Sequence, residues 1–127
     1  MKPRESAPKP PKSGISREYF RDGLLSSVGR YADGKKTGVW KYYLRNGNLK
    51  ATGRYSKGEL TGAWKWYREN GKLLQIGKFK NSKQEGLWKR YYPNGRPYDE
   101  GKYVDGKKTG LWKNYDSKGS LIRTKTY

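Results

Sequence analysis

Apolar side chains occur along this chain mainly as single aromatic residues that recur every 24 positions, with glycine and charged residues between them. A glycine opens each of five copies of this unit: Gly14, Gly38, Gly62, Gly86 and Gly110. The register holds from copy to copy without an insertion or deletion, which is the sequence signature of a repeat architecture. The copies span residues 14–37, 38–61, 62–85, 86–109 and 110–127.

The aromatic rows provide the most apolar positions of the repeat, so we expect them to form its core. Position three of the unit holds Trp40, Trp64, Trp88 and Trp112, with Ser16 in the first copy. Position six holds Tyr19, Tyr43, Tyr67, Tyr91 and Tyr115, and position eighteen holds Tyr31, Tyr55, Phe79, Tyr103 and Tyr127. A second glycine row lies at position sixteen: Gly29, Gly53, Gly77 and Gly101, then Lys125.

Each copy predicts a β-hairpin. In the second copy one strand is expected over residues 39–44 and its partner over residues 49–56, joined at Asn46-Gly47. Asn-Gly suits a type I′ turn, because both central residues of that turn need a positive φ. A second turn is expected between copies, at Asp33-Gly34, Lys57-Gly58, Asn81-Ser82 and Asp105-Gly106. Helices are not expected, since glycine recurs often and no apolar stripe has a period of 3.6 residues.

The predicted fold is therefore all-β: an elongated, single-layer antiparallel meander of five tandem 24-residue hairpins. Successive copies would advance by about 10 Å, so equivalent side chains would lie in rows across the sheet. The Trp row and the Tyr row at position six have opposite strand parity. Either a bulge lies between them or neither face of the sheet is fully polar.

The composition gives no support to catalysis. The chain has no Cys and no His, which excludes disulfides and thiolate zinc sites and removes the commonest general base. Asp99 and Glu100 are adjacent, so in a strand they would point to opposite faces and not share a substrate. We expect no enzyme activity, no metal and no cofactor.

The pattern Gly-x-Trp-x-x-Tyr-x-x-Asn-Gly, followed by Gly-x-Tyr-x-x-Gly-Lys, resembles the MORN repeat, and most closely its bacterial variant. It is clearest over residues 38–47 and 101–112, and it extends over residues 14–127. The resemblance implies an elongated sheet of hairpins, a non-catalytic role in protein or lipid contact, and often dimerisation; some bacterial members are labelled antitoxin-like. Ser16 in place of the first Trp and Ser82 in place of a turn glycine depart from the pattern.

The charge is the strongest indication of function. The formal net charge is +19, from 30 Lys and Arg against 11 Asp and Glu. Position four holds Arg17, Lys41, Lys65, Lys89 and Lys113, and position seventeen holds Arg30, Arg54, Lys78 and Lys102. Neither row contains an acid, and the acids are expected mainly in turns, as at Asp22, Asp33, Glu69, Asp105 and Asp116. This segregation favours an anion-binding stripe over an ordinary solvated face.

Two further features accompany the basic rows. Tyr42, Trp66 and Tyr92 stand at positions that are not aromatic in every copy, so they are candidates either for a contact surface or for filling a sheet face. Residues 1–13 carry Pro, Lys and Arg and form an expected flexible basic tail. The N-terminal segment has no apolar stretch, and the expected location is cytoplasmic.

The first functional hypothesis is a non-catalytic accessory scaffold that binds nucleic acid or a nucleoprotein complex, such as a ribosome or a nucleic-acid-guided enzyme. The alternative is a protein-interaction module, antitoxin-like or otherwise partner-binding, that covers an acidic partner. A second alternative is peripheral binding to anionic membranes, which electrostatics alone would have to support. Because an open sheet has two unpaired edges, the sequence also leans weakly towards a homodimer.

Overall fold

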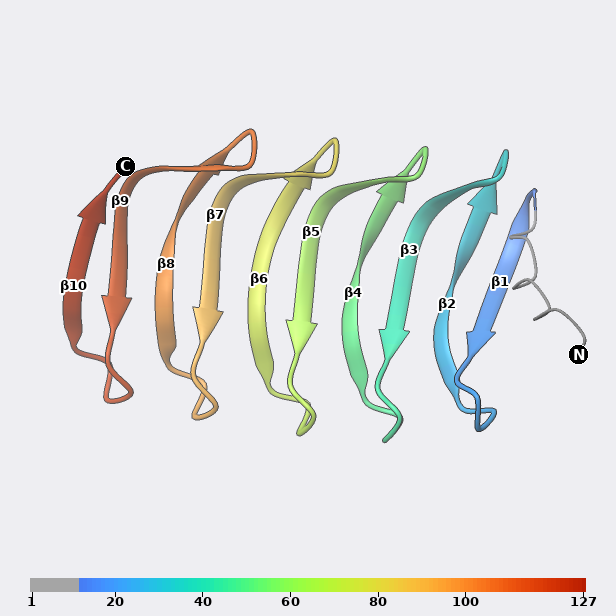
Figure 1. The fold of residues 1–127 in the computed structure, drawn as a ribbon, viewed down its shortest axis with the longest axis horizontal. Helices are drawn as coiled ribbons and strands as arrows, with labels where there is room; N and C mark the ends of the chain where they lie inside the picture. The colour runs from blue at the N-terminus through green and yellow to red at the C-terminus, as the bar shows by residue number, and fades with distance from the viewer. Residues whose placement is uncertain (1–11) are drawn as a thin grey trace, which may run out of the picture.

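In the computed structural model, which describes residues 12–127, the chain forms one open sheet of ten antiparallel strands (Figure 1). Strands that are adjacent in the sheet are adjacent in sequence, so the chain is a meander without crossovers. This confirms the predicted all-β fold; residues 1–11 of the predicted tail lie outside the described residues. The strands are β1 (Gly14–Tyr19), β2 (Leu25–Ala32), β3 (Lys35–Tyr43), β4 (Leu49–Ser56), β5 (Glu59–Tyr67), β6 (Leu73–Lys80), β7 (Lys83–Tyr91), β8 (Pro97–Val104), β9 (Lys107–Tyr115) and β10 (Leu121–Thr126).

The two kinds of turn differ from the prediction. Asp33 and Gly34 both have positive φ, 50° and 75°, so the type I′ geometry belongs to the turn between copies. At Asn46-Gly47 only the glycine is left-handed, with φ of 86°. There the Asn46 side chain accepts a hydrogen bond from the backbone N–H of Asn48 at 2.9 Å. The predicted type I′ turn at Asn46-Gly47 is therefore wrong, because an Asn side chain that bonds its own loop builds a longer connection with one left-handed residue.

The odd-numbered strands begin earlier than predicted. β3 starts at Lys35, so the glycine that opens the copy, Gly38, lies inside the strand with φ of 67°. The register with the preceding strand shifts next to these glycines, which marks a β-bulge. The bulge bends the strand. Figure 1 shows the bend in β3, β5, β7 and β9, shortly after the turn that precedes each of these strands. The glycine that opens the second copy therefore marks a bend within a strand and not the start of that strand.

The Trp row at position three and the Tyr row at position six lie on opposite faces of the sheet. A second bulge occurs in each hairpin, but on the even strand: Tyr42 pairs with Ala51 and Tyr43 with Leu49, so Lys50 is the extra residue. The odd strand stays regular from Trp40 to Tyr43, and its side chains alternate between the faces. We call the side that bears Trp40, Trp64, Trp88 and Trp112 the tryptophan face.

The core lies on the tryptophan face. Trp64 is only 3 % exposed, and its indole lies against Gly53 of the preceding strand, where a Cβ would come within 2.0 Å of the ring. Its Nε1–H donates to the Arg54 carbonyl at 3.1 Å. Tyr55 and Phe79 pack edge-on against the two sides of this ring, with centroids 5.2 and 6.2 Å away. The same arrangement recurs around Trp40, Trp88 and Trp112. The Trp row and the aromatic row at position eighteen therefore form one continuous layer.

The Ser at position three of the first copy and the Lys at position sixteen of the fifth copy both fit this packing. Each Trp needs a glycine on the strand before it, and β1 has no preceding strand within the described residues, so Ser16 replaces a Trp that would have nothing to cover. Conversely, each position-sixteen glycine accepts the Trp of the next copy. In the described sheet β10 pairs only with β9, so no Trp covers position sixteen of the fifth copy, and the Lys125 ammonium lies 4.9 Å from the Tyr127 ring centroid.

Candidate binding faces

The two cation rows lie on the same side of the sheet. In the β3–β4 pair, Lys41 is opposite Thr52 and Arg54 is opposite Val39. Cross-strand partners share a face, and these pairs alternate with the Trp40–Gly53 pair of the tryptophan face. We call the opposite side the basic face. It carries both rows predicted from the sequence: Arg17, Lys41, Lys65, Lys89 and Lys113, with Arg30, Arg54, Lys78 and Lys102.

Apolar side chains also lie on the basic face, between its cations, and the sequence reasoning missed them. A shallow groove of about 420 Å³ at the β1–β3 end is lined by Arg17, Arg30 and Lys41 together with Ile15 and Val39. Ile15 and Val39 are 55 % and 47 % exposed. They belong to a row at position two: Ile15, Val39, Ala63, Leu87 and Leu111. The sequence does contain a sign of this row. In every copy an apolar residue stands two positions before the cation of position four, and residues two apart in a strand point to the same face.

The positive charge of the basic face is not uniform. Glu100 in β8 lies 3.7 Å from the Lys89 ammonium and accepts a hydrogen bond from the Tyr115 hydroxyl at 2.5 Å, which raises the pKa of Tyr115. Glu85 pairs with Lys78 in the β6–β7 register. The expectation that acids lie mainly in turns holds for half of the acids in the described residues; the others lie in strands, at Glu18, Glu59, Glu85, Asp99 and Glu100. In the strands from β1 to β5 the one acid of this face is Glu59, which lies opposite Ser56 at the start of β5, two positions from the partner of Arg54.

The predicted contact aromatics do not join the basic rows. Tyr42 and Trp66 lie half-buried on the tryptophan face, each between two successive indoles. Trp66, for example, has ring centroids of Trp64 and Trp88 at 6.1 and 5.6 Å. Tyr92 follows the end of β7, where its hydroxyl donates to the Tyr115 carbonyl at 2.6 Å. In the structure, Tyr42 and Trp66 fill the sheet face.

A cation sits among the aromatic rings at the N-terminal end of the tryptophan face. The Lys36 ammonium lies 4.7 Å from the Trp40 ring centroid and 5.2 Å from that of Tyr55, and it donates to the Tyr42 hydroxyl at 3.2 Å. The Tyr42 and Tyr55 hydroxyls are 2.7 Å apart. Burial raises the pKa of both phenols, and the bond to Tyr42 raises the pKa of Tyr55 further. The two neutral phenols bind one another, and Tyr42 accepts a hydrogen bond from Lys36.

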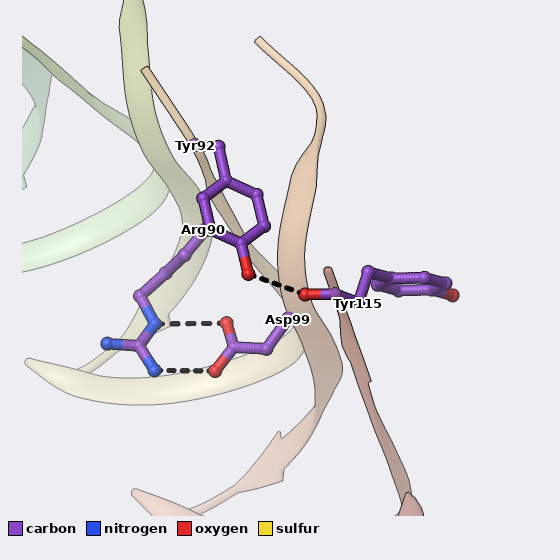
Figure 2. A network of polar contacts seen from close by, with 4 residues as sticks. All are labelled: Arg90, Tyr92, Asp99 and Tyr115. Carbon is purple, nitrogen blue, oxygen red and sulfur yellow. Dashed lines mark hydrogen bonds and ion pairs between the residues drawn. The ribbon is translucent and has the colours of Figure 1, made fainter. Parts of the chain in front are cut away.

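An ion pair replaces this aromatic filling in the fourth copy. Arg90 stands at the position of Tyr42 and Trp66, and its Nε and Nη2 donate to the two carboxylate oxygens of Asp99 at 2.9 and 2.5 Å (Figure 2). Asp99 is 4 % exposed, so its charge is compensated by a bidentate partner. This hydrogen bonding raises the pKa of Arg90. Asp99 and Glu100 thus lie on opposite faces with separate partners.

The described residues contain neither a cluster of three or more potential metal ligands nor a helix long and apolar enough to cross a membrane.

Comparison with known families and structures adds the following. The family model described as "MORN repeat variant" matches three consecutive stretches, residues 36–57, 60–81 and 84–105. No curated protein matches the chain. A crystal structure of an S. aureus TarM mutant in complex with Fondaparinux, alpha-GlcNAc-glycerol and UDP is 16 % identical, with a TM-score of 0.46 over 70 % of this chain and 18 % of that one. A crystal structure of a GtfA/B complex bound to UDP and GlcNAc is 16 % identical, with a TM-score of 0.34 over 95 % of this chain and 25 % of that one. Both TM-scores are low, and this chain spans a quarter or less of either structure, so neither bears on its function.

Proposed function

This chain belongs to the MORN repeat variant family, and from that premise we propose that it is a non-catalytic scaffold whose basic face binds nucleic acid through the backbone phosphates. The observation that carries the proposal is the gathering of both cation rows on one face of a rigid sheet. Equivalent cations of successive copies would meet successive stretches of a polyanion, because copies advance by about 10 Å. Contacts of this kind read charge and position the polymer without reading its sequence.

The cleanest part of the interface is its N-terminal half. Arg17, Arg30 and Lys41 line one groove, and the face around them bears no acid. Arg54 and Lys65 continue the two rows on β4 and β5. In the C-terminal half Glu100 engages Lys89, which removes one cation from contact with an anion. We therefore place the strongest binding over β1 to β5.

The exposed apolar row favours a second candidate, a protein partner with an acidic surface. Leu87 and Leu111 are 46 % and 51 % exposed between the cation rows. Phosphate backbones gain nothing from such side chains, whereas interfaces between proteins bury apolar area within a charged rim. The two candidates are separable by their salt dependence, since a partner held by apolar burial loses less affinity as salt is added.

The test is a salt titration of binding to short duplex DNA and single-stranded RNA, measured by fluorescence anisotropy. We expect the logarithm of the affinity to fall linearly with the logarithm of salt concentration, with a slope of about 0.9 per phosphate neutralised on DNA. The double variant Lys41→Glu, Lys65→Glu changes two cations of the clean half and should bind much more weakly with a shallower slope.

The matched control changes the charge equally, away from the basic rows. Lys57 and Lys118 lie in turns, and the double variant Lys57→Glu, Lys118→Glu should retain most of the affinity. If the two double variants weaken binding equally, the net charge and not the basic face attracts the polymer. No binding at low salt would exclude the nucleic-acid function, and capture of one acidic protein that resists high salt would favour the second candidate. Co-flotation with anionic vesicles would point to a membrane surface instead.

A further inference from the structure

The aromatic layer of the tryptophan face has one gap. Between Trp40 and Trp64 lies the Tyr42 ring, and between Trp64 and Trp88 lies the Trp66 ring. Between Trp88 and Trp112 the equivalent residue is Arg90. Its guanidinium is bound to Asp99 and lies over the Tyr98 ring at 4.9 Å. A hollow of about 210 Å³ remains at this place.

The walls of the hollow combine rings with hydrogen-bonding groups. Trp88, Tyr103 and Trp112 supply the aromatic surface, and the polar groups are those of Gln75, Gln84, Arg90, Asp99 and Lys108. The bonds to Asp99 use Nε and Nη2 of Arg90, so Nη1 still has donors to give. Each glutamine amide offers both a donor and an acceptor. The Lys108 ammonium lies 4.6 Å from the Trp112 ring centroid, at the same site.

The shape, size and charge of the hollow restrict its ligand. Its neighbours in the layer hold a flat ring at about the same spacing, so a flat ring completes the pattern. The volume is below the range of roughly 300–1,000 Å³ typical of sites for drug-sized molecules, which restricts the ligand to little more than one ring system. Arg90 and Lys108 against Asp99 leave one net positive charge, which favours an anionic substituent.

We propose that the hollow between Trp88 and Trp112 binds a flat, polar-edged ring that carries a negative charge, the chemistry of a nucleotide. The ring takes the place that Trp66 occupies in the preceding copy, the glutamine amides bond its edge, and Arg90 Nη1 and Lys108 bind the phosphate. The site lies on the opposite face from the basic rows and does not depend on the proposed function. The same chemistry is offered by a free nucleotide and by the end of an oligonucleotide.

Calorimetric titration with uridine and adenosine monophosphates tests the proposal. We expect saturable binding of one nucleotide per chain, about tenfold or more weaker binding of the uncharged nucleosides, and none of inorganic phosphate alone. A 5′-phosphorylated dinucleotide that binds as tightly as the monomer would assign the site to a chain end, whereas a preference for the monomer would assign it to free nucleotides. Failure of every nucleotide to bind at millimolar concentration overturns the proposal.

Two double variants copy one repeat into another. Arg90→Trp with Asp99→Gln reproduces the Trp66–Gln75 pair of the third copy and closes the hollow without leaving a buried carboxylate unpaired. It should fold as the parent does and lose nucleotide binding. The reverse exchange, Tyr42→Arg with Ala51→Asp, places the Arg–Asp pair in the second copy and leaves every residue that lines the hollow unchanged, so nucleotide binding at the hollow should persist. Unchanged affinity in the first variant, with its fold verified by circular dichroism, would also overturn the proposal. The basic-face variant Lys41→Glu, Lys65→Glu should bind nucleotides normally, so the two proposals fail separately.

Discussion

At the scale of single residues, the absence of one methyl group decides whether each Trp can lie on the sheet. The indoles of Trp40, Trp64, Trp88 and Trp112 lie against glycines whose Cβ would come within 2.0 to 2.1 Å of the ring. No rotamer adjustment of a neighbour relieves such a contact, because the indole is itself held by a backbone hydrogen bond. The pairing of Trp and glycine across adjacent strands is therefore one structural unit, although the two residues lie 11 positions apart in the sequence.

A matched pair of substitutions tests this unit. Gly77→Ala should displace the Trp88 indole and lower the free energy of unfolding by about 3 kcal/mol, the upper part of the range for overpacked cores. Lys125→Gly restores the repeat residue at the equivalent position of the fifth copy, which no Trp of the described sheet covers, and should gain nothing from packing. Urea denaturation with an unchanged slope measures both. Equal effects of the two changes would contradict the role given to the glycine.

The bonded pair of phenols predicts a loss of stability at alkaline pH. The pKa values of Tyr42 and Tyr55 are raised above the ordinary value of 10.0, so the folded chain keeps these protons while the unfolded chain releases them. Stability is then fully present below about pH 10 and falls as the pH rises above it. Thermal unfolding from pH 8 to 11 should show a shallower decline in Tyr55→Phe than in the parent chain. An identical decline in the two proteins would mean that other groups control the effect.

At the scale of elements, the loops at the Asn-Gly end of the hairpins are tied to one another. Asn46 Nδ2 donates to the carbonyl of Glu69 in the next copy at 3.0 Å, and Asn94 Nδ2 does the same to Ser117 at 2.7 Å. The Oδ1 atom of each asparagine meanwhile accepts a backbone N–H of its own loop, at Asn48 and Arg96. One asparagine thus both shapes its loop and joins it to the following hairpin.

Replacement of this asparagine tests the link between hairpins. Asn94→Ala removes both bonds and should cost about 1–2 kcal/mol, since each hydrogen bond contributes about 1 kcal/mol net. Asn94→Asp keeps the acceptor for the Arg96 N–H but loses the donor to Ser117, so it should lose only part of that stability. The free energy of unfolding from chemical denaturation distinguishes the two. A variant Asn94→Asp as unstable as Asn94→Ala would assign the whole effect to the inter-copy bond.

The contrast between loops explains what sequence reasoning could and could not give at this scale. The period of 24 located every hairpin, because glycine and aromatic rows mark the strands directly. It misplaced the type I′ turn, because Asn46-Gly47 carries the right residue types and only the side-chain bond to Asn48 shows that a different turn forms. It also began the strand of the second copy after the opening glycine, since a glycine bulge and a glycine turn look alike in sequence.

At the scale of the whole molecule, the same sheet presents two chemically different faces. Strand alternation predicted the separation of Asp99 from Glu100 and the shared parity within each cation row. The placement of both rows on one face required the bulge positions, because a bulge changes the parity between strands. The hollow at Arg90 could not be predicted from the sequence for another reason. It exists because no ring lies between Trp88 and Trp112, and only the packing of the neighbouring copies shows that a ring occupies the equivalent place there.

The open edges of the sheet give the last prediction. Within the described sheet β10 pairs only with β9, all of its side chains are exposed, and Ile122 is 62 % exposed. An exposed apolar edge pairs readily with a second strand, so we expect two chains to join through β10 into a dimer. Arg123 and Lys125 repel their counterparts across such a contact, and added salt should therefore strengthen it. Light scattering over a range of concentration and salt measures the mass.

Proline variants separate edge pairing from other modes of association. Successive backbone N–H groups of a strand point to opposite sides, so one of Thr124 and Lys125 directs its N–H towards β9 and the other towards the open edge. Because proline lacks this donor, one of the variants Thr124→Pro and Lys125→Pro should dissolve the dimer while the β9–β10 hairpin stays folded, and the other should disturb that hairpin. A monomeric mass of the parent chain at every concentration and salt would rule out the dimer. A dimer that survives both substitutions would place its contact elsewhere. The next candidate would be the edge formed by β1, because β1 pairs only with β2 in the described sheet.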